Sequence, residues 1–171
     1  MHWKHFPCRK MDGPIVNLEA FRGLQEHLHN NYQVRGLDLG SCSLHTVHNV
    51  YKAGLMASKW RLDILLSSVS RLFLDAPARR EDFVAVTGQS LFPLKLCAHQ
   101  WIENIPVIER VLLLWSDVRE YVEVARSKEM ILPNCASFQN LVDFCSDLLV
   151  VAKLKFALAF AVTHQPFLTN F

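Results

Sequence analysis

One long run of apolar residues at helical spacing limits what this chain can fold into. Over residues 106–126 the apolar positions recur every three or four residues, and most of the charged residues fall between them. The stripe consists of Val107, Ile108, Val111, Leu112, Trp115, Val118, Val122 and Ala125. Such spacing gathers apolar side chains on one face of an α-helix, and that face must be covered by other parts of a core. The sequence therefore predicts a long amphipathic helix over 107–125 that packs this face in the core.

The most apolar segment of the chain lies nearer its C-terminus. Residues 148–162 hold only two charged side chains, Lys153 and Lys155. The segment is too short to span a bilayer, so it predicts a buried helix in a globular protein. Asp147 is placed to cap this helix, and Pro166 is placed to close it.

The remaining pattern is helical, with one exception near the N-terminus. Apolar residues at helical spacing run through 16–28, through 60–73 and through 138–145. Residues 34–39 are instead a short apolar run that leads into a Gly-Ser turn, and they are the one credible strand. The predicted fold class is mainly α with one or two short strands.

Composition narrows the functional classes only a little. With 51% hydrophobic and 20% charged residues, the chain has the make-up of a folded globular protein. A net charge of +2 is too small to imply nucleic-acid binding by itself. The five cysteines lie far apart in the sequence, which is not a disulfide framework and favours reduced thiols. No apolar secretory signal is present at the N-terminus.

Three possible metal ligands follow the predicted strand at intervals of three residues. Cys42, His45 and His48 would share one face of the helix that begins there. In one interpretation they bind zinc, with Cys97 or His99 completing a tetrahedral set. In the other, Cys42 is a small buried side chain and the histidines are structural.

Three segments resemble, in the same order, parts of hAT-type transposases and of the genes derived from them. Residues 42–45, with His48 and Asn49, resemble the Cys-x2-His segment of that family. Residues 11–17 resemble the loop that carries the second catalytic aspartate, and residues 92–104 resemble its Arg-Trp segment. The resemblance extends from about Asp12 to the end of the chain.

This resemblance implies part of a ribonuclease H-like core over residues 1–54, followed by an all-helical insertion region over 55–171. In the intact enzymes three carboxylates hold Mg²⁺ ions for cleavage and joining of DNA strands. Asp12 matches the second of these metal-binding, catalytic carboxylates, while the first and third are expected outside the chain. We therefore expect a fragment that is catalytically inactive alone and holds no cofactor by itself.

The resemblance also assigns roles to residues outside the carboxylate set. Trp101 matches a tryptophan that stacks on a flipped base, although Gln100 stands where the family has arginine. Cys42 and His45 would support the architecture of the active site. Arg79 and Arg80 form the densest basic pair in the middle of the chain, and they are either DNA contacts or a solvated face paired with nearby acidic residues.

Two functions follow as expectations. The first is a nuclear, transposase-like fragment that binds DNA or protein; without the resemblance, a cytoplasmic location is equally open. The alternative is a helical protein-interaction module with no nucleic-acid role. Its mark would be an exposed apolar patch on the 107–125 helix or the 148–162 helix, available for self-association or for other proteins. No membrane association is expected. The transposase kinship requires Asp12 to lie beside Cys42 and residues 34–39 to be extended.

Overall fold

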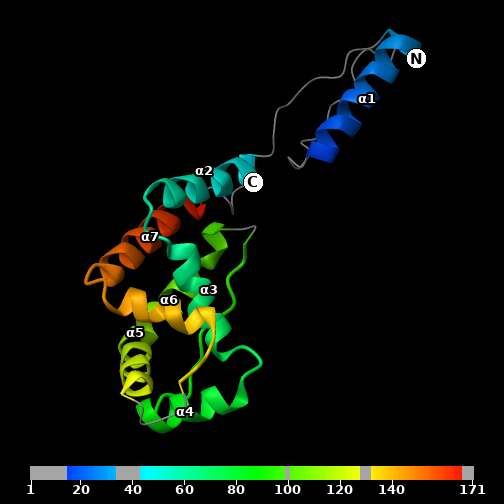
Figure 1. Cartoon of the computed structure of the whole chain (residues 1–171). Helices are drawn as coiled ribbons and strands as arrows, with labels where there is room; N and C mark the ends of the chain where they lie inside the picture. The colour runs from blue at the N-terminus through cyan, green and yellow to red at the C-terminus, as the bar shows by residue number, and fades with distance from the viewer. Residues whose placement is uncertain (1–14, 34–42, 99–100, 128–131, 167–171) are drawn as a thin grey trace. The chain divides into compact units, whose positions relative to one another are not determined.

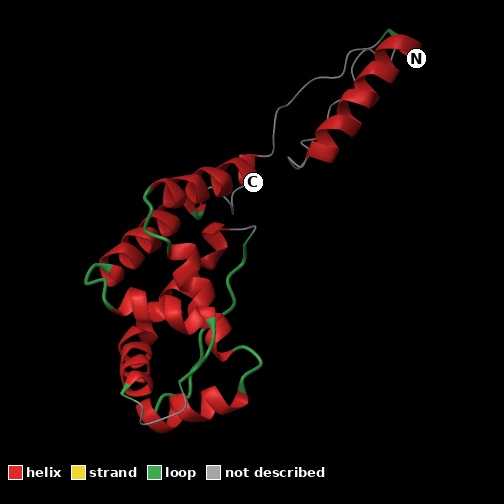
Figure 2. Ribbon diagram, viewed as in Figure 1, coloured by secondary structure: helices red, strands yellow, loops and turns green. Residues whose placement is uncertain are grey.

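The computed structural model describes residues 15–33, 43–98, 101–127 and 132–166 (Figure 1). These ranges contain seven α-helices and one 3-10 helix, and they contain no strand (Figure 2). The predicted helical class is therefore confirmed for the described part of the chain. The predicted strand over 34–39 lies outside the described residues, as do both Asp12 and Cys42. The ribonuclease H-like core accordingly stays a prediction.

The chain divides into two compact units, Met1–Val50 and Tyr51–Phe171. The first unit holds α1 (Ile15–Tyr32) and the beginning of α2 (Ser43–Ala57). The second unit holds the end of α2 and every later element, in the order α3 (Leu62–Phe73), α4 (Pro77–Thr87), η1 (Trp101–Asn104), α5 (Ile105–Arg126), α6 (Ala136–Cys145) and α7 (Val150–His164). The division falls inside α2, whereas the sequence predicts a boundary after residue 54.

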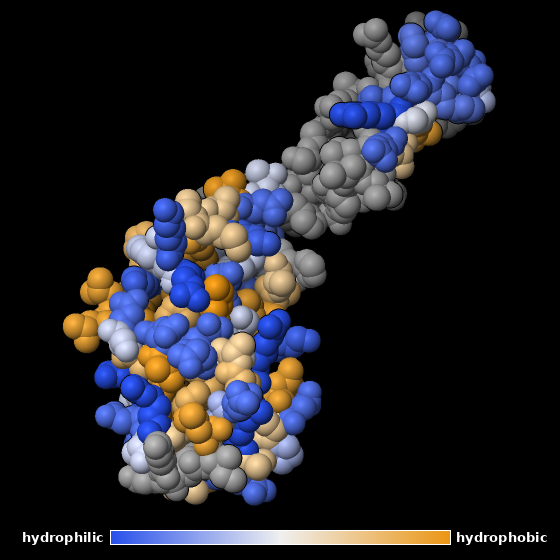
Figure 3. Space-filling view, in the orientation of Figure 1, coloured by the Kyte–Doolittle hydropathy of each residue, from blue (hydrophilic) through white to orange (hydrophobic). Residues whose placement is uncertain are grey.

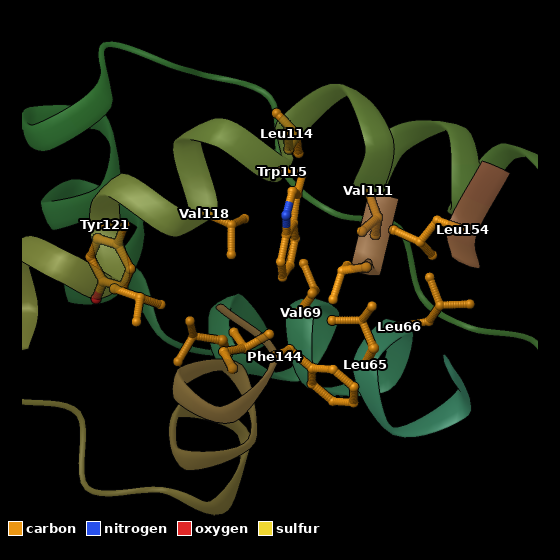
Figure 4. Close-up of a cluster of buried hydrophobic side chains, with 14 of the residues drawn as sticks. Leu65, Leu66, Val69, Val111, Leu114, Trp115, Val118, Tyr121, Phe144 and Leu154 are labelled. Carbon is orange, nitrogen blue, oxygen red and sulfur yellow. The ribbon is translucent and has the colours of Figure 1, made fainter. Parts of the chain in front are cut away.

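The core of the second unit forms where α3, α5, α6 and α7 meet (Figure 4). Helix α5 supplies the largest share. The core packing predicted for the stripe at 107–125 is confirmed, since every member of that stripe except Leu112 is buried. Leu114 and Tyr121 are also fully buried on α5, although the stripe does not include them. Leu65, Leu66 and Val69 extend from α3 toward Val111 and Trp115 of α5. Helix α5 packs against α3, α6 and α7, and these contacts position the three helices around it.

Aromatic rings fill the end of the core near α4. The rings of Phe73, Phe83 and Tyr121 lie 4.8–5.8 Å apart between centroids, and Phe92 from the following segment joins them. Edge-to-face and tilted contacts of this kind add stability beyond the area they bury. The hydroxyl group of Tyr121 has no hydrogen-bond partner among the described residues. Burial raises the pKa of this phenol above its usual value of 10.0, so the group stays protonated.

Helix α7 departs from its prediction. It begins at Val150 and not at Leu148, and it buries only one of its faces. The buried residues are Val150, Leu154, Ala157 and Ala161. The prediction of a buried helix is wrong because the described residues cover α7 on one side only, chiefly through α5 and η1. Apolar composition shows that a helix can be buried, but neighbouring elements decide how much of it is.

Asp147 explains where α7 begins. Its carboxylate accepts the backbone N–H of Leu149 at 2.9 Å and a hydrogen bond from the Lys153 ammonium group. The predicted capping residue thus lies at the start of the helix, but it orders the turn before the first helical residue. Leu148 and Leu149 belong to that turn and stay largely in solvent.

Candidate interaction surface

The predicted metal and carboxylate residues fall largely beyond the described ranges. Asp12, Cys42 and His99 lie outside them, and the side chain of His45 is not described. His45 and His48 are on helix α2 as predicted, and His48 is buried. In the described part of the chain, no three His, Cys, Asp or Glu side chains gather as metal ligands would. The zinc and catalytic roles stay predictions.

Trp101, the predicted base-stacking residue, lies in the interior. It opens the 3-10 helix η1 and is only 4% exposed, and its indole N–H has no hydrogen-bond partner among the described residues. Stacking on a nucleobase requires an open ring face. A base could reach this ring only after η1 had moved, so the structure offers no ready stacking platform here.

A buried asparagine holds η1 in place. The side-chain oxygen of Asn104 accepts the backbone N–H of Cys97 at 2.7 Å. Its side-chain nitrogen donates to the carbonyl oxygens of Cys97 at 2.8 Å and of Trp101 at 3.3 Å. Both ends of the amide are therefore used, which joins the irregular segment before η1 to the start of α5. The sequence pattern marks Asn104 only as a helix start, so this role was missed.

Arg79 and Arg80, the predicted phosphate contacts, bond to the protein's own backbone. Arg79 Nη1 donates to the carbonyl oxygen of Leu72, and Arg80 Nε donates to that of Phe73, both at 2.8 Å. These carbonyls end α3, where a helix leaves acceptors without intrahelical partners. The Arg80 guanidinium also lies 5.2 Å from the centroid of the Phe92 ring. The pair therefore caps α3, and its role in binding DNA stays a prediction.

Helix α7 and the turn before it carry six exposed large apolar side chains in the described part of the chain. We call this set the α7 face. Its members are Leu148, Leu149, Val151, Phe156, Phe160 and Val162. Leu148 is 92% exposed, Leu149 61% and Phe156 58%. Figure 3 shows apolar side chains standing out from the turn between α6 and α7, at the left of the view. Several exposed apolar side chains on one helix mark a contact site more often than single exposed leucines do.

Aromatic side chains border one edge of the α7 face. Phe156 meets Trp60 edge to face, with 5.4 Å between ring centroids. Phe160 stacks on Tyr51 at 5.4 Å, and the Tyr51 hydroxyl donates to the carbonyl oxygen of Ala157 at 2.8 Å. Burial raises the pKa of Tyr51 to about 12. His164 stacks on Phe160 at 4.2 Å, so these contacts hold the edge while Phe156 stays largely exposed.

Backbone strain accompanies this aromatic edge. Lys59 and Arg61, on either side of Trp60, both adopt left-handed conformations with φ of 58° and 56°. Residues with a Cβ rarely take such angles, so the surrounding contacts must hold them there. The turn between α2 and α3 therefore fixes the backbone that carries Trp60.

Two surface hollows among the described residues lack the side chains of a catalytic group. One, of about 450 Å³, lies on the outer side of α5 and is lined by Ser116, Arg119, Glu120, Glu123 and Val124. Another, of about 470 Å³, includes Cys135 but has no histidine or carboxylate among its lining residues. Burial raises the pKa of the Cys145 thiol to about 11, which makes it a poor nucleophile at neutral pH. Neither hollow places a nucleophile beside a histidine.

No helix in the described ranges combines the length and the apolar character needed to cross a lipid bilayer. Comparisons with protein-family models, with curated proteins and with solved structures gave no match. The described residues therefore define a class, a helical protein that exposes an apolar helix face, and the function is inferred from that face.

Proposed function

We propose that the chain is a helical protein-interaction module and that the α7 face is its docking surface. The observation that carries this proposal is the exposure of Phe156 and Val162 on a helix that is apolar on nearly every side, with Leu149 exposed in the turn before it. An exposed patch on this helix is the mark that separates an interaction module from a nucleic-acid binder.

The composition of the face supports a protein partner. Interface centres are enriched in aromatic and apolar side chains and depleted in charge. The α7 face joins four exposed aliphatic side chains to two phenylalanines, with Trp60 and Tyr51 beside them. Rings already held by neighbouring rings lose little freedom on binding, and pre-ordering of this kind lowers the cost of association.

Site-specific photo-crosslinking tests the proposal. A benzoylphenylalanine placed at Phe156 should form discrete protein adducts in cells that express the chain. The matched control carries the same group at Leu113, which is equally exposed at 61% but stands alone on the polar side of α5. Adducts at 156 should disappear when Val162→Asp is added. Equal adducts from both positions, or none from 156, would contradict a docking role for α7.

A second candidate is the kinship with hAT-type transposases. In support, the regular structure of the described residues from Tyr51 onward is all helical, as the resemblance implies for the insertion region of that family. In this proposal the fragment associates with DNA through basic side chains such as Arg79 and Arg80. Their bonds to the end of α3 would have to be shared with phosphates.

Salt dependence of DNA binding separates the two candidates. A DNA-binding fragment should lose affinity for a fluorescent duplex steeply as salt rises, because phosphate contacts release counterions. Arg79→Gln should weaken that binding, with Arg119→Gln on the outer side of α5 as the control. Absence of DNA affinity at low salt would remove this candidate and leave the interaction module.

A further inference from the structure

The α7 face holds one charge without a counter-charge. Helix α7 has two lysines and no carboxylate. Lys153 is bound to Asp147, so its charge is balanced. Lys155 is exposed and has no ion-pair partner among the described residues. The face is therefore apolar with a single positive centre.

The position of Lys155 places that charge within the apolar surface. Val151 precedes it by four residues and Val162 follows it by seven, so all three share one side of the helix. Ala152 and Ala159, both exposed, lie about one turn before and after it. Small side chains at these positions let a second helix approach closely. A helix lying along this surface would meet Lys155 near the middle of the contact.

The charge of Lys155 also makes a second copy of the chain a poor partner for the α7 face. Two α7 helices meeting through this face would bring two Lys155 ammonium groups into one apolar contact. Neither helix offers a carboxylate, and Asp147 is already bonded to Lys153. Buried charges without partners are costly, and like charges at an interface select against that pairing.

We infer that the occupant of the α7 face is an acidic amphipathic helix of another protein, with an aspartate or glutamate that reaches Lys155. Its apolar side chains, three and four residues apart, pack on Leu149, Phe156 and Val162. Its carboxylate balances Lys155. This inference rests on the proposed function, since it names the partner chemistry of the same surface.

A displayed library of amphipathic helices tests the inference on the full chain. The library keeps a leucine stripe and varies the flanking positions among acidic, basic and neutral residues. Helices selected on the wild-type chain, and lost on Val162→Asp, should be rich in Asp and Glu. Selection on Lys155→Glu should shift that preference toward Lys and Arg, and wild-type binders should bind this variant roughly tenfold more weakly.

Each other outcome has a defined meaning. Equal use of acidic and basic helices, or no shift with Lys155→Glu, overturns the acidic partner while the docking surface stands. If no library helix binds the wild-type chain and loses that binding with Val162→Asp, the docking surface itself is contradicted. Dimerisation of the wild-type chain that Val162→Asp abolishes would assign the face to a second copy and overturn the inference. Leu113→Asp on α5 serves as the folding and charge control, with circular dichroism confirming helix content for every variant.

Discussion

Helices α5 and α7 are both rich in apolar residues, but they relate differently to the core. In α5 the apolar residues form one stripe, the charged residues lie mostly opposite, and burial follows that division. In α7 the apolar residues surround the helix, yet only one side of it is covered. The fold thus uses nearly all the apolar surface of α5 and leaves much of that of α7 in water. The apolar surface that α7 leaves exposed points to a role beyond folding.

The largest expected effect tests how completely α5 is buried. Leu114→Ala removes a fully buried side chain of α5 and should lower the free energy of unfolding by about 2–5 kcal/mol. Its neighbour Leu113 is exposed, and Leu113→Ala should change stability by less than about 0.5 kcal/mol. Urea unfolding followed by circular dichroism measures both. Similar losses for the pair would mean that α5 is not oriented as described.

The next effect concerns η1, the short helix that contacts both α5 and α7. Asn104→Ala deletes the three hydrogen bonds that the side-chain amide makes to backbone groups of Cys97 and Trp101. We expect a loss of about 2–3 kcal/mol, measured by urea unfolding. Asn134→Ala, at an exposed position, is the control and should be nearly neutral. Trp101 fluorescence should move to longer wavelength in the Asn104 variant as the indole becomes hydrated, and an unchanged spectrum would show that the amide does not hold η1.

A smaller effect is expected on the uncovered side of α7. Phe156→Ala removes the edge-to-face contact with Trp60 but little buried area, so it should cost about 1 kcal/mol. Leu154→Ala, one half-turn away and fully buried, should cost several times more. Thermal unfolding of the two variants gives the ratio. If Phe156→Ala were the more damaging change, the α7 face would be part of the core.

The smallest effect depends on pH. The hydrogen bond from Lys153 lowers the pKa of Asp147 below its usual range, and the backbone N–H of Leu149 adds to this. Since the folded pKa lies below the unfolded one, the carboxylate contributes its full stability above about pH 4 and loses it as the pH falls through the folded value. Asp147→Asn should cost about 0.5 kcal/mol at neutral pH, and the difference from wild type should vanish in acid. A difference that grows in acid would contradict the pairing.

These two helices also show what the sequence could predict. The packing of α5 in the core could be predicted because its apolar and charged residues lie on opposite sides, which shows which side of the helix is buried. The existence of α7 was equally clear, but its composition has no polar side to reveal which face would be covered. The exposed patch follows from the positions of α5 and η1, which local spacing does not encode.

The polar contacts were harder to foresee. Asn104 bonds to Cys97, seven residues earlier in a segment without regular structure, so no helical or strand period connects the two. Arg79 and Arg80 stand next to acidic residues in the sequence, yet they bond to carbonyls at the end of the preceding helix. Asp147 was the exception, because a carboxylate just before an apolar helical run is a local capping signal.

The amide of Asn104 bears on how relatives of this chain could be found. Leucine, isoleucine, valine and phenylalanine replace one another readily in a core when total volume is kept, so the apolar pattern can drift until alignment fails. A side chain that must donate and accept in the same place has few substitutes. A distant homologue would be recognised better by an asparagine three residues after an interior tryptophan, just ahead of a long amphipathic helix, than by its apolar residues.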